Sequence, residues 1–464
     1  MMLFKMKVMQ FGEGNFLRTF VDLYLDSLNK EGDLKYDVTI VKSVPFGSID
    51  QLMKQDCKYN IVLRGRANGK DVEDVYKVDS VTNAIDLYKD KEAFYRLAED
   101  KEVKLVISNT TEAGITFIES DKQEMFPDVS YPAKLTLWLY HRYKSHLPGV
   151  YILPVELIDN NASVLENCVN KYIDLFDLGE DFRAWNLENN FYCNTLVDRI
   201  VSGHPKDQET ESHLYDLVGY EDPLLSVGEP FGLWVIEDKG DIKNILKDGN
   251  HNIDVVFAKD ISYYKKRKVR VLNGSHTNLV PVGLWLGKET VYDVMNDKLL
   301  SSFVNKTLDE NIIPFVSSNI EETKSFAEDV KQRFLNPFLN HQLTSIALNS
   351  ISKWKARVLP SFNDFYEKNH RIPVFFAIGF AYLITLYMNI EKVDNGYICH
   401  LPNRDIEIKD DEKYLNYFTN KTVHDFLSDK SIWDIDLTSF EKFETIINNY
   451  LIDIKKGKNL IEYV

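Results

Sequence analysis

The stretch KVMQFGEGNFLRTFVDLYLDSLNKEGDLKYDVTIVKSV, residues 7–44, decides the fold of this chain. Its first apolar residues predict a strand over residues 7–12, and its last ones predict a second strand over residues 36–44. Between them, apolar residues recur at helical spacing and stop at Gly32, which predicts a helix over residues 15–32. Strand, glycine turn, helix and strand in this order form a βαβ unit, with which a parallel sheet begins.

The same alternation continues through the first half of the chain. Short apolar segments that predict buried strands alternate with longer segments of helical spacing, and this pattern is typical of a parallel sheet covered by helices. An inserted hairpin is expected from residues 61–65 and 75–81, and further strands are expected between residues 191 and 258. The other strands are predicted at residues 103–109 and 149–156, and the helices at residues 91–100 and 131–145.

The pattern changes after Asp260, because apolar residues from residue 277 to residue 387 recur mainly at helical spacing. The chain has 464 residues, whereas single cores stop growing at roughly 250–300 residues, so two domains are expected. The predicted fold class is α/β. We expect a Rossmann-like dinucleotide-binding domain with extra strands over residues 1–260, followed by a mainly α-helical substrate and catalytic domain over residues 261–464.

Composition and charge exclude several classes of function. Lys and Arg number 55 and Asp and Glu number 71, so the net charge of −16 disfavours binding to nucleic acid or to an anionic membrane. No uncharged apolar run reaches the ~18 residues of a membrane span, and the N-terminus lacks a secretory pattern. We therefore expect a soluble cytoplasmic protein, a monomer or weak homo-oligomer, that acts on a small molecule. The 4 cysteines lack C-x-x-C or zinc-ligand spacing, which predicts reduced thiols and no metal site.

Gly12 and Gly14 form a G-x-G turn between the first strand and its helix. Such a turn lets a pyrophosphate approach the backbone, and the helix N-terminus offers unpaired N–H groups and partial positive charge. Two parts of the dinucleotide fingerprint are missing, because Leu17 replaces the third glycine and Lys42 stands near the usual place of a ribose-binding acid. NAD and NADP therefore both stay open at this point, and the alternative is an ordinary turn that binds nothing.

An unusual combination of polar residues occurs in the apolar stretch KVRVLNGSH, residues 268–276. Asn273 and His276 are three residues apart, so on a helix they share a face. Lys268 precedes His276 by eight residues, roughly 12 Å of helical rise, so a straight helix would hold the lysine away from the imidazole. We expect Lys268 to lie in the segment that enters the helix, with Gly274 or an Asn273 cap providing a bend. The plainer interpretation is a helix start capped by Asn273, with a solvated lysine and a hydrogen-bonded histidine.

These two motifs, with other segments along nearly the whole chain, resemble those of the polyol-specific long-chain dehydrogenases, the mannitol dehydrogenase family. FGEGNFLR resembles the family's G-x-G-x-F-x-R nucleotide turn, and LVDRI matches its V-D-R-I signature. KVRVLNGSH fits K-x4-N-x2-H, which is the family's most specific motif. The other resembling segments are SNTTEAGI (residues 108–115), LPVELIDNN (153–161), RFLNPFLNH (333–341) and SISKWKARVLP (350–360).

The resemblance implies a role for each motif and NAD as the cofactor, with no metal. It assigns Lys268 as the general acid/base, and Asn273 and His276 as holders of the reacting oxygen. This agrees with the chemistry, because fixed N–H donors stabilise the negative charge that grows on a ketone oxygen during hydride addition, and an ammonium then delivers the proton. The cofactor-binding residues implied are Phe11, Gly12, Gly14, Asn15, Phe16, Arg18, Asn109, Thr111 and Glu112.

The substrate implied is a sugar acid. Mannitol dehydrogenases have an asparagine where this chain has Leu157, as expected of the family's hexuronate branch, so Asn160 or Asn161 is expected to compensate unless it caps the next helix. An acid also needs a cation to bind its carboxylate. The candidates are Lys353, Lys355 and Arg357 of SKWKAR, for which a solvated helix face is the alternative, and Arg199 beside Asp198 of VDRI, for which a structural ion pair is the alternative.

The reaction implied by the resemblance is the NAD-dependent interconversion of D-tagaturonate and D-altronate by hydride transfer, in hexuronate catabolism. The alternatives within the family keep the chemistry and change the substrates to fructuronate and mannonate, or to fructose and mannitol. A dinucleotide-binding sensor without turnover is a different class of function. A sensor predicts a damaged K-x4-N-x2-H motif, whereas all three residues are present here.

Overall fold

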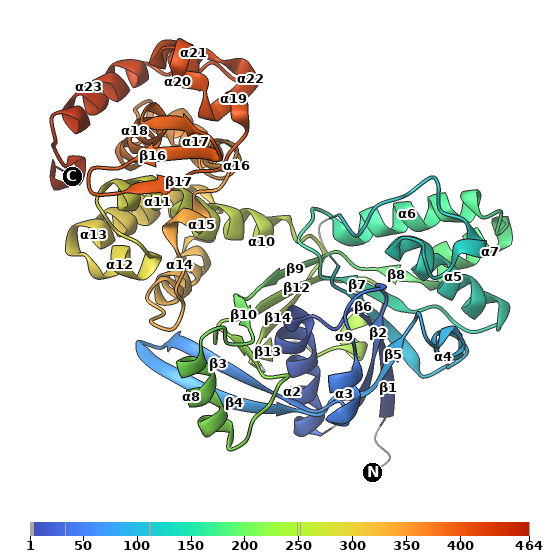
Figure 1. The fold of residues 1–464 in the computed structure, drawn as a ribbon. Helices are drawn as coiled ribbons and strands as arrows, with labels where there is room; N and C mark the ends of the chain where they lie inside the picture. Colours follow the sequence, from blue (N-terminus) through green and yellow to red (C-terminus); the bar gives the residue numbers. More distant parts are fainter. Residues whose placement is uncertain (1–3, 33, 111–112, 248, 251, 464) are drawn as a thin grey trace. The chain divides into compact units, whose positions relative to one another are not determined.

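The computed structural model describes residues 4–32, 34–110, 113–247, 249–250 and 252–463. The chain divides into two compact units, Met1–Ile261 and Ser262–Val464, which we call unit 1 and unit 2. Unit 1 runs from blue to green along the colour gradient of Figure 1, and unit 2 continues to red. Each unit has its own arrangement of helices and strands and is described separately.

The centre of unit 1 is a six-stranded sheet in the order β5-β2-β1-β6-β7-β8. All neighbouring strands in it are parallel, and Val8 of β1 lies between Val38 of β2 and Leu105 of β6. The predicted parallel sheet is thus confirmed, and the direction of chain winding reverses between β1 and β6. The strands are β1 (Phe4–Phe11), β2 (Leu34–Lys42), β5 (Val81–Asp86), β6 (Val103–Ser108), β7 (Tyr151–Pro154) and β8 (Phe191–Tyr192).

Helices cover this sheet because successive residues of its strands point to opposite faces. Val8 belongs to one apolar cluster together with Phe20, whereas its neighbour Met9 belongs to a second cluster together with Trp138. Both faces of the sheet are therefore buried, as in other parallel sheets. The helices of unit 1 are α1 (Asn15–Leu17), η1 (Arg18–Asp22), α2 (Leu23–Glu31), α3 (Asp50–Lys54), α4 (Lys91–Ala98), α5 (Tyr131–Lys144), α6 (Asn161–Leu175), α7 (Glu180–Asn189), α8 (Gln208–Val218) and α9 (Ile242–Ile245).

Two smaller sheets complete unit 1. The first has the order β10-β11-β3-β4, and its antiparallel pair β3 and β4 is the predicted hairpin, with Tyr59 opposite Val78. The second has the order β13-β14-β12-β9, and its four strands lie in the region between residues 191 and 258, where further strands were expected. Their bounds are β3 (Tyr59–Ala67), β4 (Lys70–Val78), β9 (Thr195–Asp198), β10 (Val201–Gly203), β11 (Ser226–Gly228), β12 (Leu233–Glu237), β13 (Gly249–Asn250) and β14 (Asp254–Ala258).

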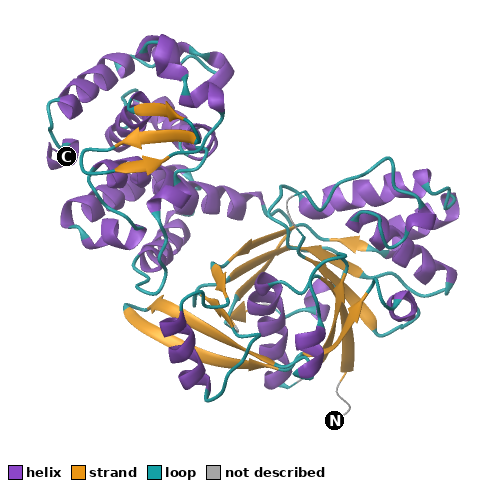
Figure 2. Ribbon diagram, viewed as in Figure 1, coloured by secondary structure: helices purple, strands orange, loops and turns teal. Residues whose placement is uncertain are grey.

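Unit 2 is mainly helical, as predicted, although the sequence did not predict its three-stranded antiparallel sheet, which Figure 2 shows in orange. This sheet consists of β15 (Ile390–Val393), β16 (Gly396–His400) and β17 (Asp405–Glu407). The principal helices are α10 (Ser262–Arg267), η3 (Lys268–Gly274), α11 (Ser275–Trp285), α12 (Val291–Asn296), α13 (Lys298–Lys306), η4 (Thr307–Ile312), α14 (Ile320–Phe334), α15 (Leu343–Ile346), α16 (Ser350–Arg357), α17 (Leu359–Asn369), α18 (Val374–Met388), α21 (Val423–Ser428) and α23 (Phe443–Lys455).

The core of unit 2 forms around α18, which is buried along almost its whole length and packs against α11. The two helices approach closely at Gly379, where a Cβ atom would lie 2.0 Å from Oδ1 of the buried Asn278. Glycine is therefore required at this crossing. Despite its apolar composition, α18 is a core helix, and none of the helices in the described residues is long and apolar enough to cross a membrane.

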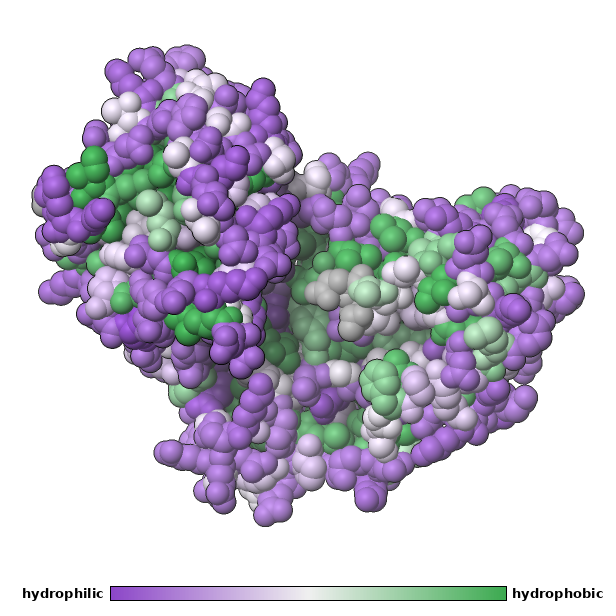
Figure 3. All heavy atoms as spheres, turned by 45° about the horizontal axis from the view of Figure 1, so that its top comes forward, coloured by the Kyte–Doolittle hydropathy of each residue, from purple (hydrophilic) through white to green (hydrophobic). Residues whose placement is uncertain are grey.

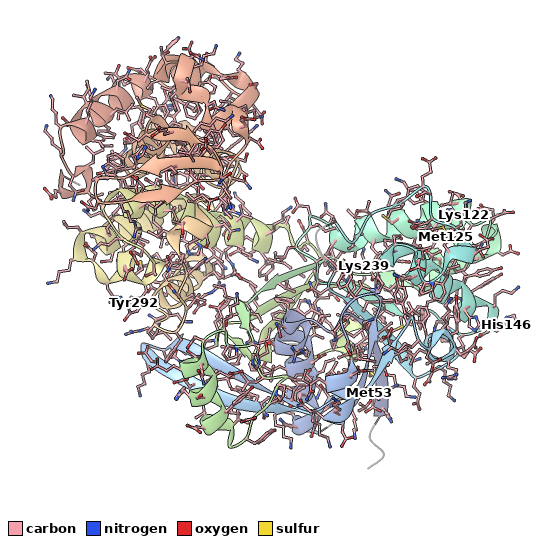
Figure 4. The ribbon with its side chains drawn as sticks, viewed as in Figure 1. Met53, Lys122, Met125, His146, Lys239 and Tyr292 are labelled. Atoms are coloured by element: carbon pink, nitrogen blue, oxygen red, sulfur yellow. The ribbon has the colours of Figure 1, made fainter. Side chains whose placement is uncertain are left out.

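On the face drawn in Figure 3, hydrophilic residues cover much of each unit, and hydrophobic residues gather in patches among the hydrophilic ones. Exposed apolar side chains include Met53 of α3 and Met125, both labelled in Figure 4. Single exposed apolar residues of this kind are normal on a folded protein.

Candidate functional site

A cavity of about 580 Å³ opens in unit 1 at the carboxyl ends of β1, β2 and β6. This is the edge at which the strand order reverses, the usual place for a ligand in an open parallel sheet. The volume lies within the range of small-molecule sites. The lining residues are Phe11, Gly12, Glu13, Gly14, Ser43, Val44, Phe46, Asn109, Thr110, Ala113, Gly114, Thr116, Ile118, Val129, Ser130, Tyr131 and Lys134.

The glycine turn shapes one wall of this cavity. Gly12 has φ +115°, and a Cβ atom there would lie 3.2 Å from both the Asn109 carbonyl oxygen and a methyl carbon of Leu17, so a larger residue would be strained at this position. Gly14 precedes the helical run Asn15–Glu31, and no atom lies within 4 Å of the position of its missing Cβ. The bare backbone at the start of the helix therefore faces open space, as a phosphate site requires.

The structure separates the predicted cofactor residues into two groups. Phe11, Gly12, Gly14 and Asn109 line the cavity. Three others do not, although they belong to the same motif: Asn15, Phe16 and Arg18. Thr111 and Glu112 lie outside the described residues.

Arg18 is buried, and its guanidinium group binds protein groups. It donates hydrogen bonds to the Leu224 carbonyl oxygen and to Oδ1 of Asn15, and it lies 5.3 Å from the centre of the Tyr59 ring. Phe16 stacks on Phe20 at 5.0 Å between ring centres. These residues hold the helix of the glycine turn against the rest of unit 1. The resemblance implied a cofactor-binding Arg18, whereas its guanidinium group has this structural role.

Two lysines lie near the end of β2, where the sequence lacks the acidic residue that usually binds the ribose of a dinucleotide. Lys42 is buried and donates to the Val44 carbonyl oxygen at 2.8 Å and to the Asp86 carboxylate at 3.3 Å. Lys134 of α5 does line the cavity, and its Nζ donates to the Ser43 carbonyl oxygen at 2.6 Å. Burial lowers the pKa of Lys134 to about 8. The sequence analysis did not identify Lys134, because its helix begins far along the chain from the glycine turn.

Glu156 is a further residue that the sequence analysis missed. Its carboxylate accepts hydrogen bonds from the Thr110 backbone N–H at 2.9 Å, the Thr110 hydroxyl at 3.0 Å and the Ser108 hydroxyl at 3.1 Å. Burial raises the pKa of this carboxyl above its usual value. Glu156 thus fixes the segment after β6 that lines the cavity. The available signal was an acidic residue at the end of the buried strand LPVE.

In unit 2, the motif KVRVLNGSH lies in the middle of a continuous helical run. α10 leads directly into the π-helical turn η3, which leads into α11. The expectation of an entering segment with a bend is therefore wrong, and so is the alternative of a helix start capped by Asn273. In a π turn the hydrogen bonds join residues five apart, so Asn273 lies one turn above Lys268. On an α-helix the same two residues would point about 140° apart.

Lys268 and Asn273 are partly buried, whereas the imidazole of His276 is buried. The His276 ring stacks on Phe334 at 4.2 Å and stands edge-on to His341 at 5.1 Å. Its Nε2 atom has no hydrogen-bond partner within the described part of the chain. Burial, the neighbouring His341 and the cations Arg333, Arg357 and Lys353 lower the pKa of His276 well below its usual value. His276 is therefore neutral at physiological pH.

Two of the predicted carboxylate-binding cations lie on α16 near this histidine. α16 packs against η3 so closely that a Cβ atom on Gly274 would lie 3.0 Å from the Arg357 carbonyl oxygen. Lys353 donates to the Ile346 carbonyl oxygen at 2.9 Å, and burial lowers the pKa of both Lys353 and Arg357. Lys355 instead forms an ion pair with Asp434 at 2.8 Å.

The other predicted substrate residues have structural positions in unit 1. Arg199 is buried, and its guanidinium group donates to the carbonyl oxygens of Phe231, Thr19, Pro230 and Asn252. Its neighbour Asp198 is the buried last residue of β9. Because backbone carbonyls take up the donors of Arg199, the prediction that it binds a substrate carboxylate is not supported by its position.

Asn160 and Asn161 were expected to replace a missing substrate ligand, or else to cap a helix. Asn161 is buried, and its side-chain Nδ2 donates hydrogen bonds to the carbonyl oxygens of Pro154 and Glu156. Its Oδ1 accepts a hydrogen bond from the backbone N–H of Thr195. It therefore joins the end of β7 to β9. Asn160 is exposed and takes a left-handed conformation, with φ +53°, at the N-cap of α6, where its side chain makes no capping hydrogen bond. Neither residue lines the cavity.

The family models and the relatives that match this chain agree with one another. Residues 6–247 match the mannitol dehydrogenase Rossmann domain, and residues 260–454 match the mannitol dehydrogenase C-terminal domain. The chain is 36% identical to the altronate oxidoreductase of Phocaeicola vulgatus, over 99% of this chain and 96% of that protein. It is 35% identical to the altronate oxidoreductase of Bacillus subtilis, over 96% of this chain and 92% of that protein.

Two solved structures share the fold. D-sorbitol dehydrogenase in substrate-free form has a TM-score of 0.79 at 19% identity, with 99% of this chain and 97% of that chain covered. The mannitol 2-dehydrogenase of Pseudomonas fluorescens, solved with NAD and D-mannitol, has a TM-score of 0.67 at 19% identity, with 99% and 94% covered.

Proposed function

The chain belongs to the mannitol dehydrogenase family, and from this premise we propose that it interconverts D-tagaturonate and D-altronate with NAD as the cofactor. It is an oxidoreductase, a dehydrogenase that acts on CH–OH groups. The choice of substrate is supported by the altronate oxidoreductases, which are 35–36% identical over more than nine-tenths of this chain. The observation that carries the proposal is the π turn of unit 2, which aligns Lys268 with Asn273 beside a buried, neutral His276.

The residues of the unit 1 cavity fit a dinucleotide. Gly12 and Gly14 leave the backbone bare where a pyrophosphate would lie, and Asn109 lines the same cavity. When bound, NADH supplies the hydride that reduces the ketone carbon. Lys42 is engaged by Asp86 and does not line the cavity, so it does not offer a charge to the 2′-phosphate of NADP. This supports NAD over NADP.

The proposed chemistry of unit 2 is proton transfer to the reacting oxygen. Asn273 and the imidazole of His276 donate hydrogen bonds to the ketone oxygen, and these bonds strengthen as negative charge grows there. The unpartnered Nε2 of His276 is the atom suited to this donation. Because His276 stays neutral, it is a poor proton source at physiological pH. The ammonium of Lys268 therefore delivers the proton, and in the reverse direction its neutral amine removes it.

The cations on α16 support an acidic substrate. Arg357 and Lys353 both lie close enough to His276 to lower its pKa, so the surroundings of the imidazole are positive. A carboxylate at the far end of a six-carbon sugar acid complements this charge, whereas a neutral ketose does not use it. Fructuronate carries the same carboxylate, so reduction of fructuronate to mannonate is the second candidate.

The test is a comparison of kcat/KM, followed by NADH absorbance, for D-tagaturonate, D-fructuronate, fructose and fructose 6-phosphate. We expect the keto-uronates to be reduced far better than the others, with D-tagaturonate the best. Arg357→Gln and Lys353→Met should raise KM for the acid, whereas Lys355→Met, the matched control whose partner is Asp434, should not. Equal efficiency with fructose would contradict the proposed substrate class, and the absence of turnover with all four would favour a sensor.

A further inference from the structure

His341 has a fixed position beside the motif histidine of unit 2, although the function proposed above does not use it. It follows α14, and its carbonyl oxygen accepts a hydrogen bond from the Val291 N–H at 3.1 Å. The next residue, Gln342, forms a β-bridge with Thr290. The backbone around His341 is thus tied to the segment before α12, which places its ring edge-on to His276 at 5.1 Å between ring centres and 85° between planes.

The ring nitrogens of His341 have hydrogen-bonding capacity that the described residues of the protein do not use. A neutral imidazole has one N–H donor and one acceptor nitrogen. Among the described residues neither nitrogen of His341 has a hydrogen-bond partner, and the side chain is only partly buried. A partly exposed polar ring that packs against another imidazole is well placed to bind a ligand, because a hydrogen bond to a ligand costs no existing protein hydrogen bond.

The charges around the two histidines select the kind of ligand. The groups that act electrostatically on His276 are His341, Arg333, Arg357 and Lys353, and Arg333 also acts on His341. The three cations Arg333, Arg357 and Lys353 lower the pKa of His276, so the local field is positive. Burial and Arg333 keep His341 neutral, so it contributes an N–H and not a charge. A hydrogen bond from this N–H to an anion is the complementary interaction.

We propose that His341 is a specificity-determining residue, which donates a hydrogen bond to the carboxylate of the sugar acid beside Arg357. This inference rests on the proposed keto-uronate substrate and gives a role to the last residue of RFLNPFLNH, for which the sequence motifs implied none. The role differs from that of His276, which holds the reacting oxygen. His341 should therefore affect the binding of the acid end and leave the chemical step unchanged.

The test uses His341→Phe, which keeps an aromatic edge against His276 and removes both nitrogens. Loss of a hydrogen bond to a charged group should raise KM for D-tagaturonate about tenfold or more, with kcat changed by less than about threefold. His341→Gln, which retains a donor, should recover part of the lost affinity. The kcat/KM for D-tagatose, the neutral ketose that lacks the carboxylate, should stay the same, so the preference for the acid should fall.

Controls separate this inference from the proposed function. His424→Phe makes the same change at an exposed histidine of α21, which pairs with Glu444, and should leave all constants unchanged. Urea unfolding of each variant checks the fold. If the wild-type enzyme prefers D-tagatose to D-tagaturonate, the proposed function fails, and the role of His341 fails with it. If the wild type prefers the acid and His341→Phe keeps that preference, or loses kcat equally for both substrates, only the role of His341 is refuted.

Discussion

Replacing Lys268 with alanine should remove the proton donor and leave the rest of the molecule in place. The side chain is partly buried in the π turn, and the backbone hydrogen bonds of that turn do not depend on it. Alanine has the highest helix propensity, so the free energy of unfolding should change by less than about 1 kcal/mol. Binding of NADH should also be retained, because the glycine turn and its cavity belong to unit 1.

The size of the catalytic loss follows from what remains beside the reacting oxygen. General acid/base catalysis contributes about 10²–10⁴-fold, which corresponds to about 3–5 kcal/mol of activation free energy. His276 cannot replace the lysine as an acid, because its pKa is held well below its usual value by burial and the neighbouring cations. We therefore expect kcat to fall by about 10³-fold or more. Lys268→Arg should not restore it, because a guanidinium group stays charged and cannot act as a base.

The assay is NADH formation from D-altronate across a pH series, for the wild type and for Lys268→Ala. The wild-type rate should rise with pH on a single ionisation, because the neutral amine removes the proton in this direction. That rise should be lost in the alanine variant. Intact NADH binding, measured by fluorescence, is the control for folding. The reasoning is refuted if the variant keeps near-wild-type kcat with an unchanged pH profile, since the proton would then come from another group.

Three other predictions test the cofactor and the core. The kcat/KM with NADH should exceed that with NADPH, because Asp86 engages Lys42; a preference for NADPH would show that a lysine serves the 2′-phosphate. Gly379→Ala should lower the free energy of unfolding in urea by about 1–3 kcal/mol, since the new methyl group meets the buried Asn278; an unchanged midpoint would mean that α11 and α18 separate easily. Burial raises the pKa of Asp22 from 3.8 to about 7, so the folded state binds this proton more tightly and stability should fall as pH rises between these values. Asp22→Asn should flatten that dependence, and an unaltered pH profile of unfolding would count against it.

The sequence predicted the parts of the fold that depend on local patterns. Period-two and helical spacing located the first βαβ unit, the hairpin of β3 and β4 and the change to helices in unit 2. It did not predict the three short strands of unit 2, whose segments contain exposed and charged residues such as Glu391 and His400. Such strands depend on antiparallel partners more than on their own burial pattern, so a short window of sequence carries little signal for them.

The candidate site was predicted less completely, because residue type does not show what a side chain contacts. Arg199 and Asn161 are both polar residues in recognisable motifs, but backbone groups far away in sequence use their hydrogen-bonding capacity. Lys134 reaches its site from a segment that no motif singled out, and His341 ends RFLNPFLNH, a segment to which the sequence assigned no role. For KVRVLNGSH, the sequence predicted that the three polar residues act together, but α-helical periodicity gave the wrong local conformation, since the spacing of a π turn does not appear in a pattern of period 3.6.

Because of the π turn, the number of residues between Lys268 and Asn273 also matters for the site. The residues from Val269 to Leu272 separate Lys268 from Asn273, and their number sets the alignment of the two side chains. Loss of one of them would leave the two residues four apart, about 40° around the axis of an ordinary α-helix, so they would still share a face. Gain of one residue would place them six apart, about 120° from each other on an α-helix. Exchange of Val269 for another helix-forming residue would leave that alignment intact. A substitution scan would therefore describe this segment as permissive, whereas a scan of single-residue insertions would identify it as one of the least tolerant parts of the chain.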